Sequence, residues 1–112
     1  MHELSITRSV VAIVAERTGD RRVTQVRLRI GRLSGVEVSA VEFCFEACAA
    51  GTALEGARLV IERVEGRGEC PACGASAPMP DLVGVCSCEA RAPLRIVSGE
   101  ELLVVDVELE DG

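Results

Sequence analysis

Cysteine thiols are the side chains of this 112-residue chain best suited to chemistry, because four of them are closely spaced. They are Cys70, Cys73, Cys86 and Cys88, in the pattern Cys-x2-Cys-x12-Cys-x-Cys. Thiolates at these separations can converge on one tetrahedral zinc ion, which can hold together a segment with too few apolar residues for its own core. We therefore expect a structural Zn(II) site, closed by sulfur and without an open position for catalysis.

The two halves of this cysteine pattern differ. Pro71 stiffens the entry to the first turn, and Gly74 permits a tight exit. The second half, Cys86-Ser87-Cys88, is one residue shorter than the usual spacing, so its sulfurs need a different local geometry. Two other interpretations remain open: inert buried thiols, or a redox pair, because Cys-x-x-Cys also marks thioredoxin-like enzymes. Those enzymes place the motif at a helix N-terminus, which the proline and glycines here disfavour.

The start of the chain offers a second set of ligand atoms. His2 is the only histidine, and a histidine beside a chain end is ordinarily a solvated side chain. At this position, however, the α-amine of Met1 and the amide and imidazole nitrogens of His2 are close enough to chelate one ion. Glu3 can supply further nitrogen or oxygen ligands. Nitrogen-rich tetragonal sites favour Ni(II) or Cu(II).

The elements that must position these groups follow from the spacing of apolar residues. Helical spacing predicts two helices, the second opened by a capping box of Ser39 and Glu42, and alternation predicts three strands. The predicted helices span residues 4–17 and about 40–50, and the predicted strands span 24–30, 57–64 and 103–109. Cys44 and Cys48 could share a metal, but they coincide with the apolar stripe of the second helix, so core packing is the favoured interpretation.

Residues 66–99 differ from the rest of the chain in composition. They contain five glycines and all four prolines, with no sustained periodicity. We therefore predict an α+β (mixed α/β) fold, with two helices on a three-stranded sheet and an inserted zinc-binding module. Residues 1–65 and 100–112 form the predicted base domain, and residues 66–99 form the zinc-binding insertion.

Composition and charge exclude several classes of function. The 12 basic and 18 acidic residues give a formal charge of −6, the wrong sign for binding phosphate backbones. Trp and Tyr are absent and only two Phe are present, so a stacking platform for nucleic acid is not expected. The sequence shows neither a secretory signal nor an apolar run of roughly 18 residues, so we expect a cytoplasmic protein without a membrane span.

Several short motifs occur together along nearly the whole chain. They are Met1-His2-Glu3, the run from Val26 to Gly35, Phe43-Cys44-Phe45-Glu46, Gly51-Thr52 followed by Glu55-Gly56-Ala57, and the late cysteine pairs. The joint pattern resembles the HypA/HybF family of hydrogenase-maturation nickel metallochaperones. The resemblance implies a cytoplasmic protein that is not an enzyme. It implies transported Ni(II), a structural Zn(II), and help in inserting nickel into the large subunit of [NiFe]-hydrogenase.

The resemblance also implies roles for particular residues and partners. Met1, His2 and Glu3 would bind nickel, and the four late cysteines would bind zinc. The family's second pair is normally Cys-x-x-Cys, so here two arrangements stay open: Cys86 and Cys88 both bind zinc, or one does and a water or neighbouring side chain takes the fourth position. The implied partners are a HypB-type GTPase and the hydrogenase large-subunit precursor, with the chain a monomer or homodimer.

Two other functions are weighed against this one. The first is a zinc-ribbon module for protein interaction or nucleic-acid binding, which the charge disfavours. The second is a dithiol oxidoreductase in which Cys70 and Cys73 change redox state.

Overall fold

A computed structural model of the chain describes residues 2–111 and divides into two compact units. The first, here called the helical unit, comprises the residues up to Arg29, Val36–Glu62 and the chain from Leu103 onward. The second, here called the cysteine unit, comprises Ile30–Gly35 and Arg63–Leu102. The cysteine unit thus contains all of residues 66–99, the flanking residues 63–65 and 100–102, and residues 30–35, which hold the end of the first strand and the turn after it.

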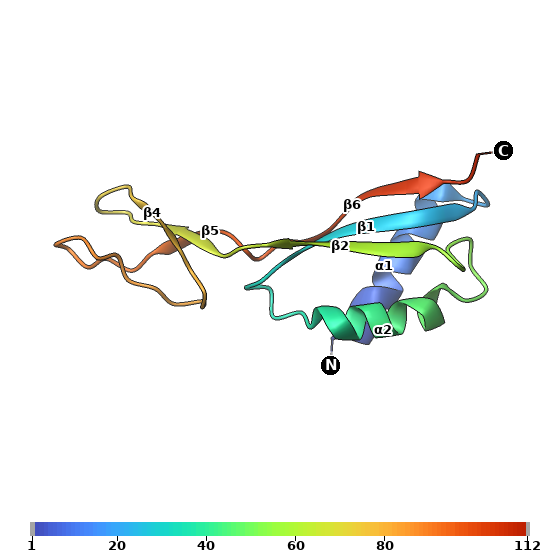
Figure 1. Cartoon of the computed structure of the whole chain (residues 1–112), viewed down its shortest axis with the longest axis horizontal. Helices are drawn as coiled ribbons and strands as arrows, with labels where there is room; N and C mark the ends of the chain where they lie inside the picture. Colours follow the sequence, from blue (N-terminus) through green and yellow to red (C-terminus); the bar gives the residue numbers. More distant parts are fainter. Residues whose placement is uncertain (1, 112) are drawn as a thin grey trace. The chain divides into compact units, whose positions relative to one another are not determined.

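The helical unit is built on a three-stranded sheet (Figure 1). Its strands are β1 (Val23–Gly31), β2 (Arg58–Val64) and β6 (Leu102–Leu109), in the order β2-β1-β6. Backbone hydrogen bonds pair Gly31 with Glu101 and Arg22 with Glu110, so β6 runs antiparallel to β1. The N–H of Arg32 donates to the Val64 carbonyl, so β1 and β2 end side by side and run parallel (Figure 1). Helix α2 (Val38–Ala49) lies in the crossover connection that parallel neighbours need.

Helix α1 (Glu3–Thr18) and α2 contact each other and cover one face of this sheet. The buried apolar side chains of the helical unit are Val10, Val11, Val14, Val23, Val26, Leu28, Val41, Phe45, Ala49 and Leu54. The opposite face of β1 carries Arg27 and Arg29, which form ion pairs with Glu62 of β2. This division matches the alternation predicted for the first strand, and the α+β prediction is confirmed.

Two details of the helices differ from the sequence predictions. Leu4 and Ile13 share the helical spacing of the apolar residues that predicts α1, and would be expected on its buried face, but both are about half exposed. The prediction of a capping box formed by Ser39 and Glu42 is wrong. Helix α2 begins at Val38, so Glu37 is the N-cap residue and Ser39 already lies inside the first turn.

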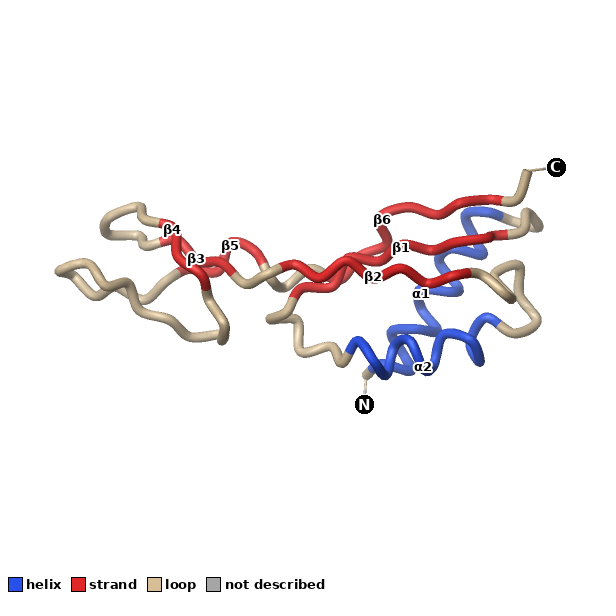
Figure 2. The backbone as a smooth tube through the Cα atoms, in the orientation of Figure 1, coloured by secondary structure: helices blue, strands red, loops and turns tan. Residues whose placement is uncertain are grey.

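The cysteine unit contains a second three-stranded sheet, made of elements too short to show periodicity in the sequence (Figure 2). It consists of β3 (Arg67–Glu69), β4 (Ser76–Pro78) and β5 (Arg95–Ser98), in the order β4-β3-β5 with both pairs antiparallel. Its buried apolar side chains are few. Ile30, Leu33 and Met79 are buried, together with the sulfur-bearing Cys70 and Cys86.

Glycines let the backbone segments of the cysteine unit approach closely. A methyl group on Gly31 would overlap the carbonyl of Gly99, and one on Gly99 would lie 2.6 Å from the Cα atom of Gly66. Gly99 also has φ +112°, which favours glycine. The chain therefore enters and leaves the segment between Gly66 and Gly99 at neighbouring points.

Neither described helix combines the length and the apolar character that crossing a bilayer requires.

Candidate metal centres

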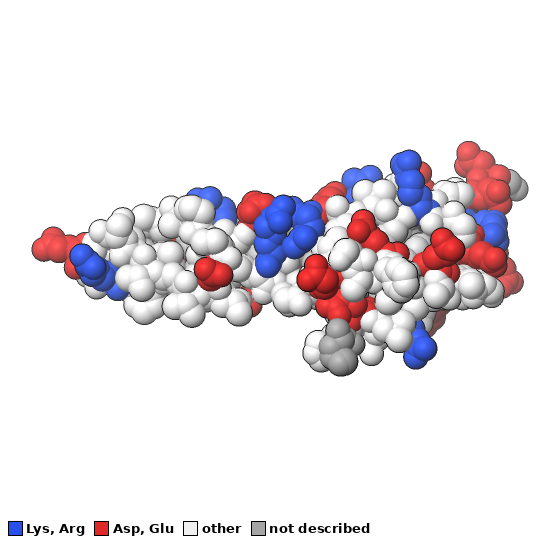
Figure 3. Space-filling view, turned by 60° about the horizontal axis from the view of Figure 1, so that its bottom comes forward, with Lys and Arg blue, Asp and Glu red and all other residues white. Residues whose placement is uncertain are grey.

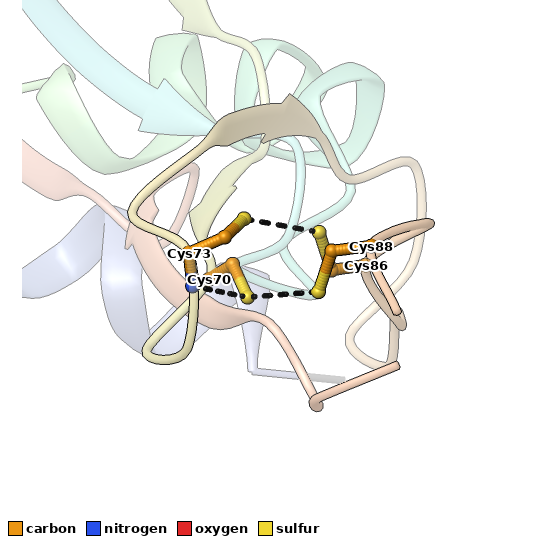
Figure 4. A group of neighbouring side chains, drawn as sticks. All are labelled: Cys70, Cys73, Cys86 and Cys88. Atoms are coloured by element: carbon orange, nitrogen blue, oxygen red, sulfur yellow. Dashed lines mark hydrogen bonds between the residues drawn. The ribbon is translucent and has the colours of Figure 1, made fainter. Parts of the chain in front are cut away.

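The four late cysteines converge on one point (Figure 4). Their sulfur atoms all lie within 4.8 Å of one another. Cys73 Sγ lies 3.7 Å from Cys86 Sγ, and Cys70 Sγ lies 3.8 Å from Cys88 Sγ. A tetrahedron of sulfurs at the usual Zn–S distance has edges of about 3.8 Å. These residues therefore fit a Zn(II) ion, and Cys88 is as close to the cluster as the other three.

A tight turn after β3 presents the first pair of sulfurs. The N–H of Gly74 donates to the Cys70 carbonyl at 2.8 Å, and Gly74 has φ +78°, as its predicted role in the turn exit requires. The N–H groups of Ala72 and Cys73 both lie 3.4 Å from Cys70 Sγ. Such donors stabilise a thiolate. Cys70 lies in a turn rather than at a helix N-terminus, as predicted, which counts against the thioredoxin-like interpretation.

The second pair is presented by a wider turn. The N–H of Arg91 donates to the Cys88 carbonyl at 3.0 Å, and the N–H of Cys86 donates to the Ala92 carbonyl at 2.9 Å. Arg91 completes the reversal with φ +49°, an uncommon conformation for a residue with a side chain. The chain thus compensates for the missing residue between Cys86 and Cys88 by a turn that extends to Ala92.

Proximity makes the thiols unequal in acidity. The pKa of Cys70 is lowered to about 6, mainly by the hydrogen bond from the Cys73 N–H. The Cys88 N–H lowers the pKa of Cys86, but burial and the neighbouring thiols outweigh it and raise that pKa to about 11. Clustered thiols resist simultaneous ionisation without a cation, and a divalent metal removes that penalty. The cluster is thus suited to holding a metal ion as thiolates.

The structure places His2 immediately before α1. Its side chain is exposed, and its carbonyl accepts the Ile6 N–H at 2.8 Å. The first turn of α1 therefore fixes the His2 backbone while leaving the imidazole accessible. Met1, the third predicted nickel-binding residue, lies outside the described residues. Nickel binding at these positions stays a prediction.

Glu3 has a structural contact that the sequence did not reveal. Its carboxylate Oε2 accepts the N–H of Glu37 at 2.9 Å, and the residue is buried. The Glu3 pKa is lowered to about 2, first by the terminal ammonium group and then by the Glu37 N–H. Glu3 thus supplies the side-chain cap that α2 otherwise lacks. No local sequence signal marks this cap, since the two residues are 34 positions apart.

The two remaining cysteines do not join the cluster. Cys44 and Cys48 on α2 are half-buried, whereas Val41 and Phe45 of the same helix are buried. The predicted packing role is therefore only partly realised, because both cysteines lie at the margin of the covered face.

Comparison with known proteins gives a consistent result along the chain. The family described as "Hydrogenase/urease nickel incorporation, metallochaperone, hypA" matches residues 1–109. The protein named Hydrogenase maturation factor HypA from Geobacter metallireducens is 56% identical over 98% of this chain and 100% of that protein.

Solved structures share the fold. The structure entitled "Solution structure of HypA protein" is similar with a TM-score of 0.70 and 25% identity, over 98% of this chain and 97% of the other. The solution structure of the Ni metallochaperone HypA from Helicobacter pylori has a TM-score of 0.65 and 24% identity, over 97% of each chain.

Proposed function

Because this chain belongs to the HypA family, we propose that it is a nickel metallochaperone that helps insert nickel into the large subunit of [NiFe]-hydrogenase. The observation that carries this function is the family match over residues 1–109, supported by a relative at 56% identity. The protein would act in the cytoplasm by protein-to-protein transfer, without catalysing a reaction.

Ni(II) is the cargo in this proposal, and it binds at the start of the chain. The α-amine of Met1 and the amide and imidazole nitrogens of His2 are the principal ligands, with the Glu3 region completing the set. The accessible His2 side chain supports this assignment, because a cargo ion must be able to leave. The capping contact of Glu3 keeps the first turn of α1 beside the start of α2.

Zn(II) is the resident ion and is held by Cys70, Cys73, Cys86 and Cys88. The tetrahedral fit of the sulfurs and the burial of Cys70 and Cys86 support a closed structural site. When bound, the ion supplies the cross-link that the few apolar side chains of the cysteine unit do not provide.

The partners proposed for transfer are a HypB-type GTPase and the hydrogenase large-subunit precursor. The family description also names urease. Delivery to hydrogenase is preferred because the relative at 56% identity is named a hydrogenase maturation factor.

The deciding experiment is metal analysis of the untagged protein and its His2→Ala variant after incubation with Ni(II). We expect the wild type to retain about one nickel and the variant almost none, because the imidazole and the local chelate geometry are lost. Zinc content and helix circular dichroism should be unchanged in the variant. Ser5→Ala, in the same exposed first turn, is the matched control and should retain nickel. Stoichiometric nickel in His2→Ala would eliminate the proposed site.

A further inference from the structure

The outer side of α2 exposes an unusual amount of apolar surface. The side chain of Phe43 is 86% exposed, whereas the only other phenylalanine of the chain, Phe45, is buried. Leu4, at the start of α1, is 45% exposed. A large aromatic side chain left in water contributes nothing to the core, and apolar patches with polar rims mark interaction sites.

The same side of the helical unit is hollowed. A groove of about 860 Å³ is lined by Leu4, Phe43, Cys44, Ala47 and Ala50, with the carboxylates of Glu42, Glu46 and Glu55 at its margin. A second groove of about 540 Å³ shares Glu42, Glu46 and Glu55 with the first and continues to Leu59 of β2. The two grooves therefore share three glutamates, and apolar side chains line part of both.

The stretch of chain that contains α2 and the loop after it carries charge of one sign. Between Arg32 and Arg58 the sequence contains four glutamates and no basic residue. Figure 3, which brings the side carrying α2 toward the reader, shows acidic side chains among uncharged ones over the helical unit, with basic side chains toward the edges of that unit in this view. No arginine is among the described residues that line either groove, so the groove carboxylates have no basic neighbour there. Apolar walls with unneutralised carboxylates complement an apolar segment that carries positive charges.

We propose that this acidic groove, lined by Leu4, Phe43, Cys44, Glu42 and Glu46, docks a basic amphipathic helix of the protein with which nickel is exchanged. Phe43 is the anchor that inserts between apolar side chains of the incoming helix, and Glu42 and Glu46 pair with its lysines or arginines. The inference rests on the proposed nickel function for the identity of the partner.

The position of the groove explains why such a partner would dock there. Leu4 lines the groove and directly follows His2 and Glu3 in the chain. A helix bound in the groove is therefore close to the proposed cargo site. This arrangement shortens the path that the ion must travel between the two proteins.

The first test uses synthetic 16-residue peptides as probes. One carries leucines on a single helical face with arginines beside them, a second replaces arginine by glutamate, and a third has the basic composition in scrambled order. We expect the basic amphipathic peptide to bind at least tenfold more tightly than either control. Equal binding of the scrambled peptide would reduce the effect to unspecific charge attraction and overturn the proposal.

Matched variants then locate the binding surface. Phe43→Ser should weaken binding of the basic peptide at least tenfold, whereas Val83→Ser, at an equally exposed position in the cysteine unit, should not. Glu42→Gln with Glu46→Gln should weaken binding and its salt dependence, unlike Glu16→Gln with Glu110→Gln. Unchanged affinity of the Phe43 variant, or dimers of the wild type that Phe43→Ser dissolves, would overturn the proposal.

A final titration uses the partner GTPase and separates this inference from the proposed function. Phe43→Ser should lower the affinity for the GTPase at least tenfold while nickel binding by the variant stays at the wild-type value. Unchanged GTPase affinity would overturn the docking assignment and leave the nickel site standing. A wild-type protein that does not bind nickel would instead refute the proposed function.

Discussion

Cys88 is the residue whose role the short Cys86-Ser87-Cys88 spacing left open. Its sulfur lies 3.8 Å from that of Cys70. The turn that ends at Arg91 and Ala92 compensates for the spacing between Cys86 and Cys88, which is one residue shorter than usual. This geometry favours the arrangement in which all four sulfurs bind one ion over an arrangement with three.

A serine at position 88 tests this four-sulfur arrangement. Cys88→Ser should weaken zinc binding by more than the roughly 10–100-fold that loss of an outer-shell contact causes, because a hydroxyl replaces a thiolate ligand. Competition with a colorimetric chelator measures the change. Cys44→Ser, at a half-buried cysteine outside the cluster, should bind zinc like the wild type. Equal affinities of the two variants would mean that three sulfurs suffice.

Nickel binding at His2 should depend on acidity. Protons and Ni(II) compete for the same nitrogen atoms, so binding releases protons and weakens as the solution becomes more acidic. Isothermal titration at about pH 5.5 and about pH 7.5 should give a clearly lower affinity at the acidic value. Equal affinities would remove the imidazole from the ligand set.

At the scale of elements, the uncovered face of the β2-β1-β6 sheet depends on paired charges. Glu62 of β2 contacts Arg29 at 3.0 Å and Arg27 at 3.3 Å, and Arg27 also lies 3.5 Å from Asp106 of β6. Hydrogen bonds from Arg29 and then Arg27 hold the pKa of Glu62 below its ordinary value of 4.5. The pairs thus link the central strand to both of its neighbours.

Glu62→Gln should destabilise the helical unit at neutral pH more than in acid. A carboxyl whose pKa is lower in the folded than in the unfolded state adds stability above its ordinary value, and this stability is lost as pH falls through the lowered pKa. Urea unfolding followed by helix circular dichroism should therefore show a difference from the wild type at about pH 7 that shrinks at about pH 3. Glu16→Gln, an exposed carboxylate of α1, is the control and should show no such trend.

The sequence was informative where an element is long and its burial regular. The alternation of Val26, Leu28 and Ile30 with arginines identified the central strand, and the spacing of cysteines identified the cluster. The cap of α2 could not be predicted, because its acceptor comes from Glu3 on another helix rather than from Ser39. The strands β3 to β5 were missed because three or four residues are too few to establish a period.

At the scale of the whole chain, the two units differ in what stabilises them. Within the described residues, the helical unit buries ten apolar side chains, whereas the cysteine unit buries only Ile30, Leu33 and Met79 together with Cys70 and Cys86. Small domains with so little buried apolar surface usually need a metal or another cross-link. The proposed dependence on zinc therefore concerns the cysteine unit.

Removal of zinc with a strong chelator should unfold the cysteine unit selectively. We expect backbone amides of residues 67–98 to lose protection from hydrogen exchange, because structural zinc contributes about 10–16 kcal/mol to folding in comparable small sites. The amides of α1, α2 and β1 should stay protected. Added zinc should restore the protection of residues 67–98. Loss of protection in α1 and α2 together with the cysteine unit would show that the units do not fold separately.

The close approach of Gly66 to Gly99 has a consequence for protein engineering. Because Gly66 and Gly99 lie side by side, the segment between them can be replaced as a unit. After its removal, a tight turn is long enough to join the two remaining chain ends. Segments of different length and with different metal-ligating residues could be inserted at this junction. Such an exchange would leave the apolar core of the helical unit unchanged.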